Sequence, residues 1–205
     1  LLEIALSLAL PLTILAARMA KASLQTAPAE IFGLGTILLV SLAVLAPFCT
    51  LSGWLFASAS GLWRVRSGAP DGESTSSVYL LESAGAAAGG LLAAALLIPR
   101  LDPLQVSFVL SWLNLLAAAY LLVERAALRL IAAALLTGGF AGLLIPSAAP
   151  RLERWSLARL WSPLRIAATA NSRYGNLVVV DREDGVTIYE NGLPVATIPD
   201  QEAAE

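Results

Sequence analysis

Residues 78–98, VYLLESAGAAAGGLLAAALLI, are the part of the sequence that most constrains the fold. About 20 apolar residues are enough for a helix to cross the hydrocarbon core of a bilayer. The stretch carries one charge, Glu82, about one helical turn from its start. We therefore predict a membrane-spanning helix in which Glu82 points inward or toward the lipid headgroups.

The same stretch contains Gly85, Gly89 and Gly90. Small residues four apart lie on one face of a helix, where they allow a second helix to approach closely. We predict that these three glycines are helix-packing residues.

The composition extends this interpretation to the whole chain. Of its 205 residues, 58% are hydrophobic and 14% are charged, whereas a soluble domain is about one quarter charged. The net charge is −2, no basic run is present, and nucleic acid is therefore not an expected partner. The sequence has no histidine, one cysteine (Cys49) and no set of metal ligands, so we expect no metal site and no internal disulfide.

We predict a mainly α, multi-pass membrane helix bundle over residues 1–145, with the lipid bilayer as its partner. Apolar runs give about five spans, at residues 1–17, 31–57, 78–98, 104–123 and 130–145. The polar residues 58–77 are predicted to form the longest loop between them.

Five spans place successive loops on alternating sides of the membrane. The segments 18–30, 99–103 and 146–165 share one side and carry seven Arg and Lys residues, against four on the other side. Cytoplasmic loops are enriched in Arg and Lys. The count therefore favours an inner (plasma) membrane protein with a cytoplasmic C-terminal tail.

Residues 146–169 are predicted to be an amphipathic interfacial linker. Arginines alternate there with leucines and tryptophans, a spacing that fits a helix in the headgroup region. The alternative is a linker whose tryptophans pack against the membrane domain.

Residues 170–200 are predicted to form a three-stranded antiparallel β-meander. Asn191-Gly192 favours a two-residue type I′ turn between its second and third strands. So small a sheet cannot bury a core alone and needs a partner. Residues 201–205 are expected to begin a truncated helix, and the chain is interpreted as a fragment of a longer protein.

The meander resembles the N-terminal β domain of spermidine synthases, the polyamine aminopropyltransferases. The similarity lies in three segments, SRYGNLVVV at 172–180, TIYENGL at 187–193 and IPD at 198–200. The segment YLLESAGAAAGG at 79–90 resembles a helix of the bacterial subfamily in which membrane helices precede the synthase.

This resemblance implies a transferase that uses decarboxylated S-adenosylmethionine, with a catalytic Rossmann domain after the meander. That domain has no counterpart before Glu205, so no catalytic residue and no cofactor are assigned to this chain. The resemblance also implies a homo-oligomer formed through the meander, which would cover the cofactor pocket. Tyr174 is a candidate substrate-binding residue, although packing within the meander is the alternative. Gly175 stands where the family tends to carry a glutamine.

Two other functions remain open. Ionisable residues within membrane spans often mark ion or substrate paths, so Glu82 is a candidate substrate-binding residue for a cationic amine. On that basis the chain could be a transporter-like module for polyamines or other small amines, with a vestigial synthase-like tail. The third possibility is a membrane anchor and oligomerisation element.

Overall fold

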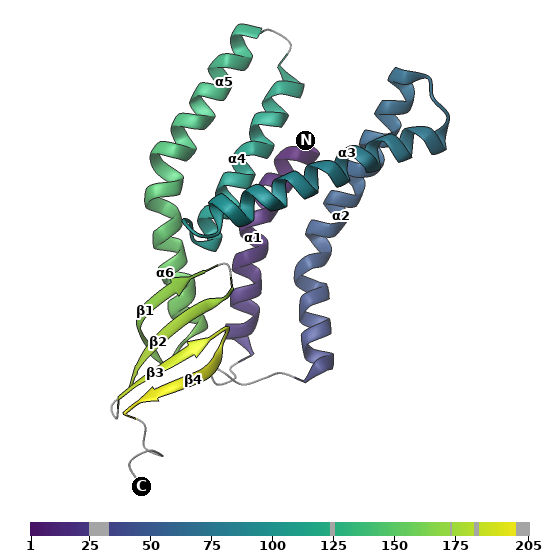
Figure 1. Cartoon of the computed structure of the whole chain (residues 1–205). Coiled ribbons are helices and arrows are strands. Elements are labelled where there is room, and N and C mark those ends of the chain that lie inside the picture. Colours follow the sequence, from purple (N-terminus) through teal and green to yellow (C-terminus); the bar gives the residue numbers. More distant parts are fainter. Residues whose placement is uncertain (25–32, 124–125, 173, 183–184, 200–205) are drawn as a thin grey trace.

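The computed structural model describes residues 1–24, 33–123, 126–172, 174–182 and 185–199. Helices occupy most of this part of the chain, and a small sheet lies at one end of them (Figure 1). The elements in order are α1 (Leu2–Ser23), α2 (Leu34–Ser67), α3 (Asp71–Leu92), η1 (Ala93–Leu97), α4 (Pro103–Leu122), α5 (Ala126–Gly139), η2 (Phe140–Ala148), α6 (Ala149–Leu160), β1 (Arg165–Asn171), β2 (Asn176–Arg182), β3 (Gly185–Glu190) and β4 (Leu193–Ile198). The segments η1 and η2 are π-helical.

The described residues contain five helical segments that are long and apolar enough to cross a membrane. Leucines such as Leu38, Leu80 and Leu130 are exposed on them. Large apolar side chains on a helix surface are stable when lipid covers them. The chain is a membrane protein, and the predicted mainly α, multi-pass bundle followed by a small antiparallel sheet is confirmed.

The predicted loop at residues 58–77 is wrong, because almost all of it is helical. Helix α2 continues to Ser67 and α3 begins at Asp71. The polar side chains remain compatible with helix because their hydroxyls donate to carbonyls four residues back, as Ser67 does to Trp63 and Thr75 to Asp71. The turn itself needs only Gly68, whose φ of 67° suits a residue without a Cβ.

The last span is longer than predicted. Helical structure runs from Ala126 to Leu160 through α5, η2 and α6, and Figure 1 shows it as one continuous rod. The linker predicted at residues 146–169 is therefore mostly the end of this rod. The helix ends at Leu160, and Pro163 lacks the backbone N–H needed to continue it.

The sheet has four strands in the order β1-β2-β3-β4, all antiparallel, where three were predicted. The additional strand is β1, which begins at Arg165 within the predicted linker. Ile166 pairs with Val180 and Thr169 with Val178, and an irregularity between Ile166 and Ala168 shifts the register by one residue. The helix predicted at residues 201–205 lies outside the described residues.

The sheet buries one face against the end of α6. Trp161, directly after α6, is 5% exposed and packs with Val178, Val180 and Tyr189. Its ring meets that of Tyr189 edge to face, with centroids 5.0 Å apart, an arrangement that aromatic pairs prefer. The partner that so small a sheet requires is therefore the membrane domain of the same chain.

Candidate functional site

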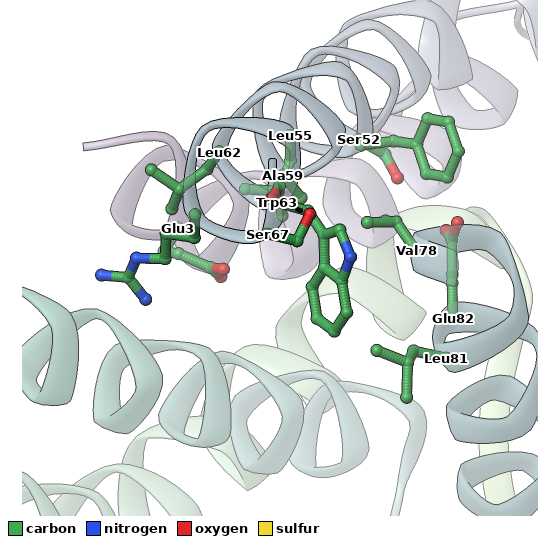
Figure 2. A pocket seen from close by; sticks show the side chains of 12 residues that line it. Glu3, Ser52, Leu55, Ala59, Leu62, Trp63, Ser67, Val78, Leu81 and Glu82 are labelled. Atoms are coloured by element: carbon green, nitrogen blue, oxygen red, sulfur yellow. Dashed lines mark hydrogen bonds between the residues drawn. The ribbon is translucent and has the colours of Figure 1, made fainter. Parts of the chain in front are cut away.

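A cavity of about 720 Å³ lies between α1, α2 and α3. Figure 2 shows side chains of Glu3, Trp63 and Glu82 around it. The lining comes mainly from α2 and α3, with Glu3 contributed by α1. Its lining combines carboxylates with apolar side chains, so it is the candidate functional site.

Helical periodicity explains which side chains face the cavity. The α2 residues in the lining recur at intervals of three and four from one helical turn to the next, at positions 52, 55, 56, 59, 62, 63, 66 and 67. Residues with this spacing share one face of a helix. From α3, Val78, Leu81 and Glu82 follow the same rule. This face is not predicted from the sequence because residues 58–77 resemble a loop.

Glu82 lies deeper in its helix than the sequence indicates. Because α3 begins at Asp71, Glu82 is 82 − 71 = 11 residues from the start, or about 16 Å at ~1.5 Å per residue. The favourable field of a helix N-terminus falls off within the first turn. The helix dipole therefore does not account for a carboxylate at this position.

The cavity brings two carboxylates and one guanidinium together. Glu3, Arg66 and Glu82 are the charged residues in the lining, and in Figure 2 Glu3 and Glu82 lie on opposite sides of Trp63. Among the described residues, none of the three takes part in an ion pair. The lining thus carries a net formal charge of −2 + 1 = −1 at neutral pH. An ammonium group near Trp63 could interact with a carboxylate and with the aromatic face.

Tyr174, the second predicted substrate-binding residue, lies elsewhere. It follows β1, is 84% exposed and does not line the cavity. Its neighbour Gly175 has a structural reason to lack a side chain. A Cβ there would lie 2.7 Å from the amide atoms of Asn191, and Asn191 accepts a hydrogen bond from the backbone N–H of Asn176 at 3.0 Å.

The three glycines predicted to pack against a helix have open space around them. A Cβ added to Gly85, Gly89 or Gly90 would meet no atom within 4 Å in the described part of the chain. Their close packing against a second helix stays a prediction. For the same described residues, no three His, Cys, Asp or Glu side chains gather where they could hold a metal ion.

A buried ion pair at the other end of the bundle was not predicted. Arg18 on α1 donates to Glu153 on α6 at 2.6 Å and to the hydroxyl of Ser156 at 2.7 Å. The two residues are 135 positions apart, and neither carries a sequence signal that identifies its partner. This pair fixes α1 against the helix that supports the sheet.

Comparisons with protein-family models, curated proteins and solved structures gave no match.

Proposed function

We propose that the chain is the membrane-embedded N-terminal part of a spermidine synthase-like aminopropyltransferase, where it serves as an anchor and as a lid and subunit-contact element. The proposal assigns the catalytic domain to sequence outside this chain. The sequence motifs of the meander suggest the family. The observation that carries the anchoring role is the packing of the sheet on α6 through Trp161.

The hairpin between β3 and β4 supports the comparison with the synthase meander. Asn191 and Gly192 both have positive φ, 51° and 86°, as a type I′ turn requires. The turn joins Thr187 and Tyr189, which face α6, to a strand whose side chains are all exposed. The hairpin thus combines a strand with buried side chains, β3, and a fully exposed strand, β4.

The second face of the sheet supports a role in contact with another domain or subunit. Val178 and Val180 are buried against α6, so the alternating Leu177 and Val179 point to the opposite face. Val186, Ile188 and Ile198 lie on that same face, because they pair with outward residues in the register. An apolar outer face of this kind is typical of interaction surfaces, and we propose that a second copy or the catalytic domain covers it.

The cofactor of the family fits the described residues poorly. The resemblance implies a side-chain amide where Gly175 stands, and the amide of Asn191 occupies the space beside that glycine. We therefore derive no catalytic step through decarboxylated S-adenosylmethionine from this chain.

An activity assay tests the proposal. Membranes containing the protein extended by the sequence that follows residue 205 are incubated with decarboxylated S-adenosylmethionine and a diamine, and the aminopropylated product is measured. Product is expected from the extended protein and not from the 205-residue chain. Activity in the 205-residue chain, or a continuation without a nucleotide-binding strand–turn–helix, would contradict the proposal.

The cavity favours a second candidate function, the binding or transport of a small amine. Two carboxylates, Glu3 and Glu82, line it beside Trp63, and charged groups in a bilayer commonly mark such paths. In reconstituted vesicles, Glu82→Gln is expected to reduce uptake of a labelled diamine at least about tenfold, since one charge-assisted contact is lost. Glu73→Gln is the matched control, because Glu73 lies on the same helix outside the cavity. Equal uptake by both variants and the parent protein would exclude this candidate.

A further inference from the structure

A chain of hydrogen bonds links the sheet to the last membrane helix through the corner between η1 and α4. Asn176 on β2 donates to Asn171 on β1 at 2.6 Å, and Asn171 donates to Asp102 at 3.1 Å. The backbone N–H of Asp102 donates to Gln105 at 2.9 Å, and Gln105 donates to the carbonyl of Ile145 in η2 at 3.2 Å. Asp102 is also the N-cap of α4.

The partners fix the orientation of each side-chain amide. A carboxylate and a carbonyl oxygen only accept hydrogen bonds. The NH₂ group of Asn171 must therefore face Asp102, which leaves its oxygen for Asn176. The NH₂ group of Gln105 must face Ile145, which leaves its oxygen for the N–H of Asp102. Reversing either amide would break two contacts at once.

The Ile145 carbonyl depends on Gln105 because of two features of the last span. In the π-helical segment η2, the N–H of Ala149 donates to Leu144, five residues back. The residue five positions after Ile145 is Pro150, which has no N–H. Gln105 supplies the donor that the helix itself does not, and leaving this partly buried carbonyl without a donor would be costly.

We propose that the hydrogen bond from Gln105 to the Ile145 carbonyl stabilises the π-helical form of η2 and thereby sets the orientation of the sheet. The N–H of Ala149 has two acceptors within reach along the helix. In the observed form it bonds Leu144 and Gln105 serves Ile145. In the other form, η2 becomes α-helical, Ala149 bonds Ile145, and the contact with Gln105 is no longer needed.

The two forms differ in the direction that α6 presents to its neighbours. Removing a π-helical bulge rotates the following helix by about 100° per residue of register, because an α-helix has ~3.6 residues per turn. Such a rotation would move Glu153 away from Arg18 and carry Trp161 and the sheet with it. Coupling between two sites requires an element with two states whose equilibrium both sites can shift. Here the element is η2, and the two sites are the sheet and the membrane helices.

Amide hydrogen exchange of the whole protein in lipid nanodiscs, measured by mass spectrometry, tests whether Gln105 stabilises the π-helical form of η2. Asn171→Ala removes the sheet end of the chain of hydrogen bonds and touches no residue of η2. It is expected to increase amide exchange in residues 144–153 about tenfold, the change expected from losing one hydrogen bond. Gln105→Glu keeps an oxygen for Asp102 but removes the donor to Ile145, and it is expected to increase exchange in the same residues and in β1.

Thr197→Val is the matched control, because Thr197 contacts Thr187 within the sheet and lies outside the chain of hydrogen bonds. It is expected to leave exchange in residues 144–153 unchanged. The proposal is overturned if Asn171→Ala changes exchange only in the sheet, or if Thr197→Val increases exchange in η2 as much as Asn171→Ala does. Asn171 lies on β1, outside the membrane helices. If Gln105→Glu fails to fold, the result with Asn171→Ala alone still decides between the two outcomes.

Discussion

Arg18 and Glu153 form an ion pair of 2.6 Å that joins α1 to α6, and their side chains are only 12% and 6% exposed. The second carboxylate oxygen of Glu153 has no hydrogen-bond partner among the described residues. A buried pair contributes little net stability, but removing one partner leaves an uncompensated charge. This asymmetry determines how substitutions at the two positions should behave.

We predict that Glu153→Ala lowers the free energy of unfolding by about 3–5 kcal/mol, because it leaves Arg18 buried without its counter-charge. The double substitution Arg18→Met with Glu153→Met should recover most of this loss, since both charges are gone. Unfolding in detergent, followed by the far-ultraviolet helical signal, measures the difference.

The exposed pair Arg64–Asp71 provides the control for this prediction. Its side chains are 53% and 78% exposed, and exposed pairs contribute about 0–1 kcal/mol. Arg64→Ala should therefore change stability much less than Glu153→Ala. Equal effects at the two pairs would mean that burial of the Arg18–Glu153 pair does not govern its contribution.

Trp161 holds the sheet on the membrane domain, and Trp161→Ala should release it. Truncating a buried tryptophan costs about 3–5 kcal/mol, and so small a sheet depends on packing against a helix for its stability. We expect limited proteolysis to cleave within residues 165–199 while the membrane helices stay intact. Trp155→Ala is the control, because Trp155 is 47% exposed on α6. Comparable cleavage of both variants would contradict this role for Trp161.

Gly185 begins β3 with a φ of 144°, a region that favours glycine, and an added Cβ would lie 2.1 Å from the carbonyl oxygen of Ile198. Gly185→Ala should therefore destabilise the sheet by at least about 1–3 kcal/mol, the cost of a strained backbone conformation. Gly192→Ala meets only the Lys21 ammonium at 3.9 Å and has a φ of 86°, so it should cost less. The midpoints of sheet protection against protease in urea give the order, and the reverse order would contradict the steric argument.

The sequence predicts the number and type of the membrane helices because length and hydropathy are local properties. It does not predict where they end at residues 58–77, where serine and threonine resemble a loop but satisfy their hydroxyls within the helix. It also misses β1, because Arg165 and Ile166 continue the pattern of arginines and apolar residues interpreted as an amphipathic linker. Here the pairing with β2 decides between two locally equivalent patterns.

The candidate site was predictable only in part. Glu82 stands out as an isolated charge in an apolar run, and the structure places it in the lining of a cavity. Glu3 and Arg66 reach the same cavity from other helices, so their arrangement depends on how α1 and α2 pack rather than on local sequence. Arg18 at the end of α1 contacts Glu153 on α6, and Asp102 contacts Asn171 on β1; the side of the membrane on which they lie stays a prediction.

Gly89 tests whether α3 packs against a second chain. Since a Cβ at this position meets nothing within 4 Å, Gly89→Leu should leave the fold of one chain unchanged. If small residues of α3 form a close contact between chains, the variant should elute from size exclusion in detergent as a smaller assembly than the parent protein. Ala94→Leu, on the same helical rod, is the control for added volume alone. An unchanged assembly for Gly89→Leu would contradict packing at this glycine.

Accessibility from the two sides of the membrane tests the predicted orientation. In a Cys49→Ala background, a single cysteine is introduced either by Glu73→Cys at the start of α3 or by Val195→Cys on β4, where both positions are exposed. The excess of Arg and Lys near the sheet predicts that this end faces the cytoplasm. A membrane-impermeant maleimide should then label intact cells at Glu73→Cys, and label Val195→Cys only after lysis.

Labelling of Val195→Cys in intact cells would reverse the orientation. Equal labelling of both positions before lysis would show that the sheet and the α2–α3 turn lie on the same side, contrary to the arrangement of the spans.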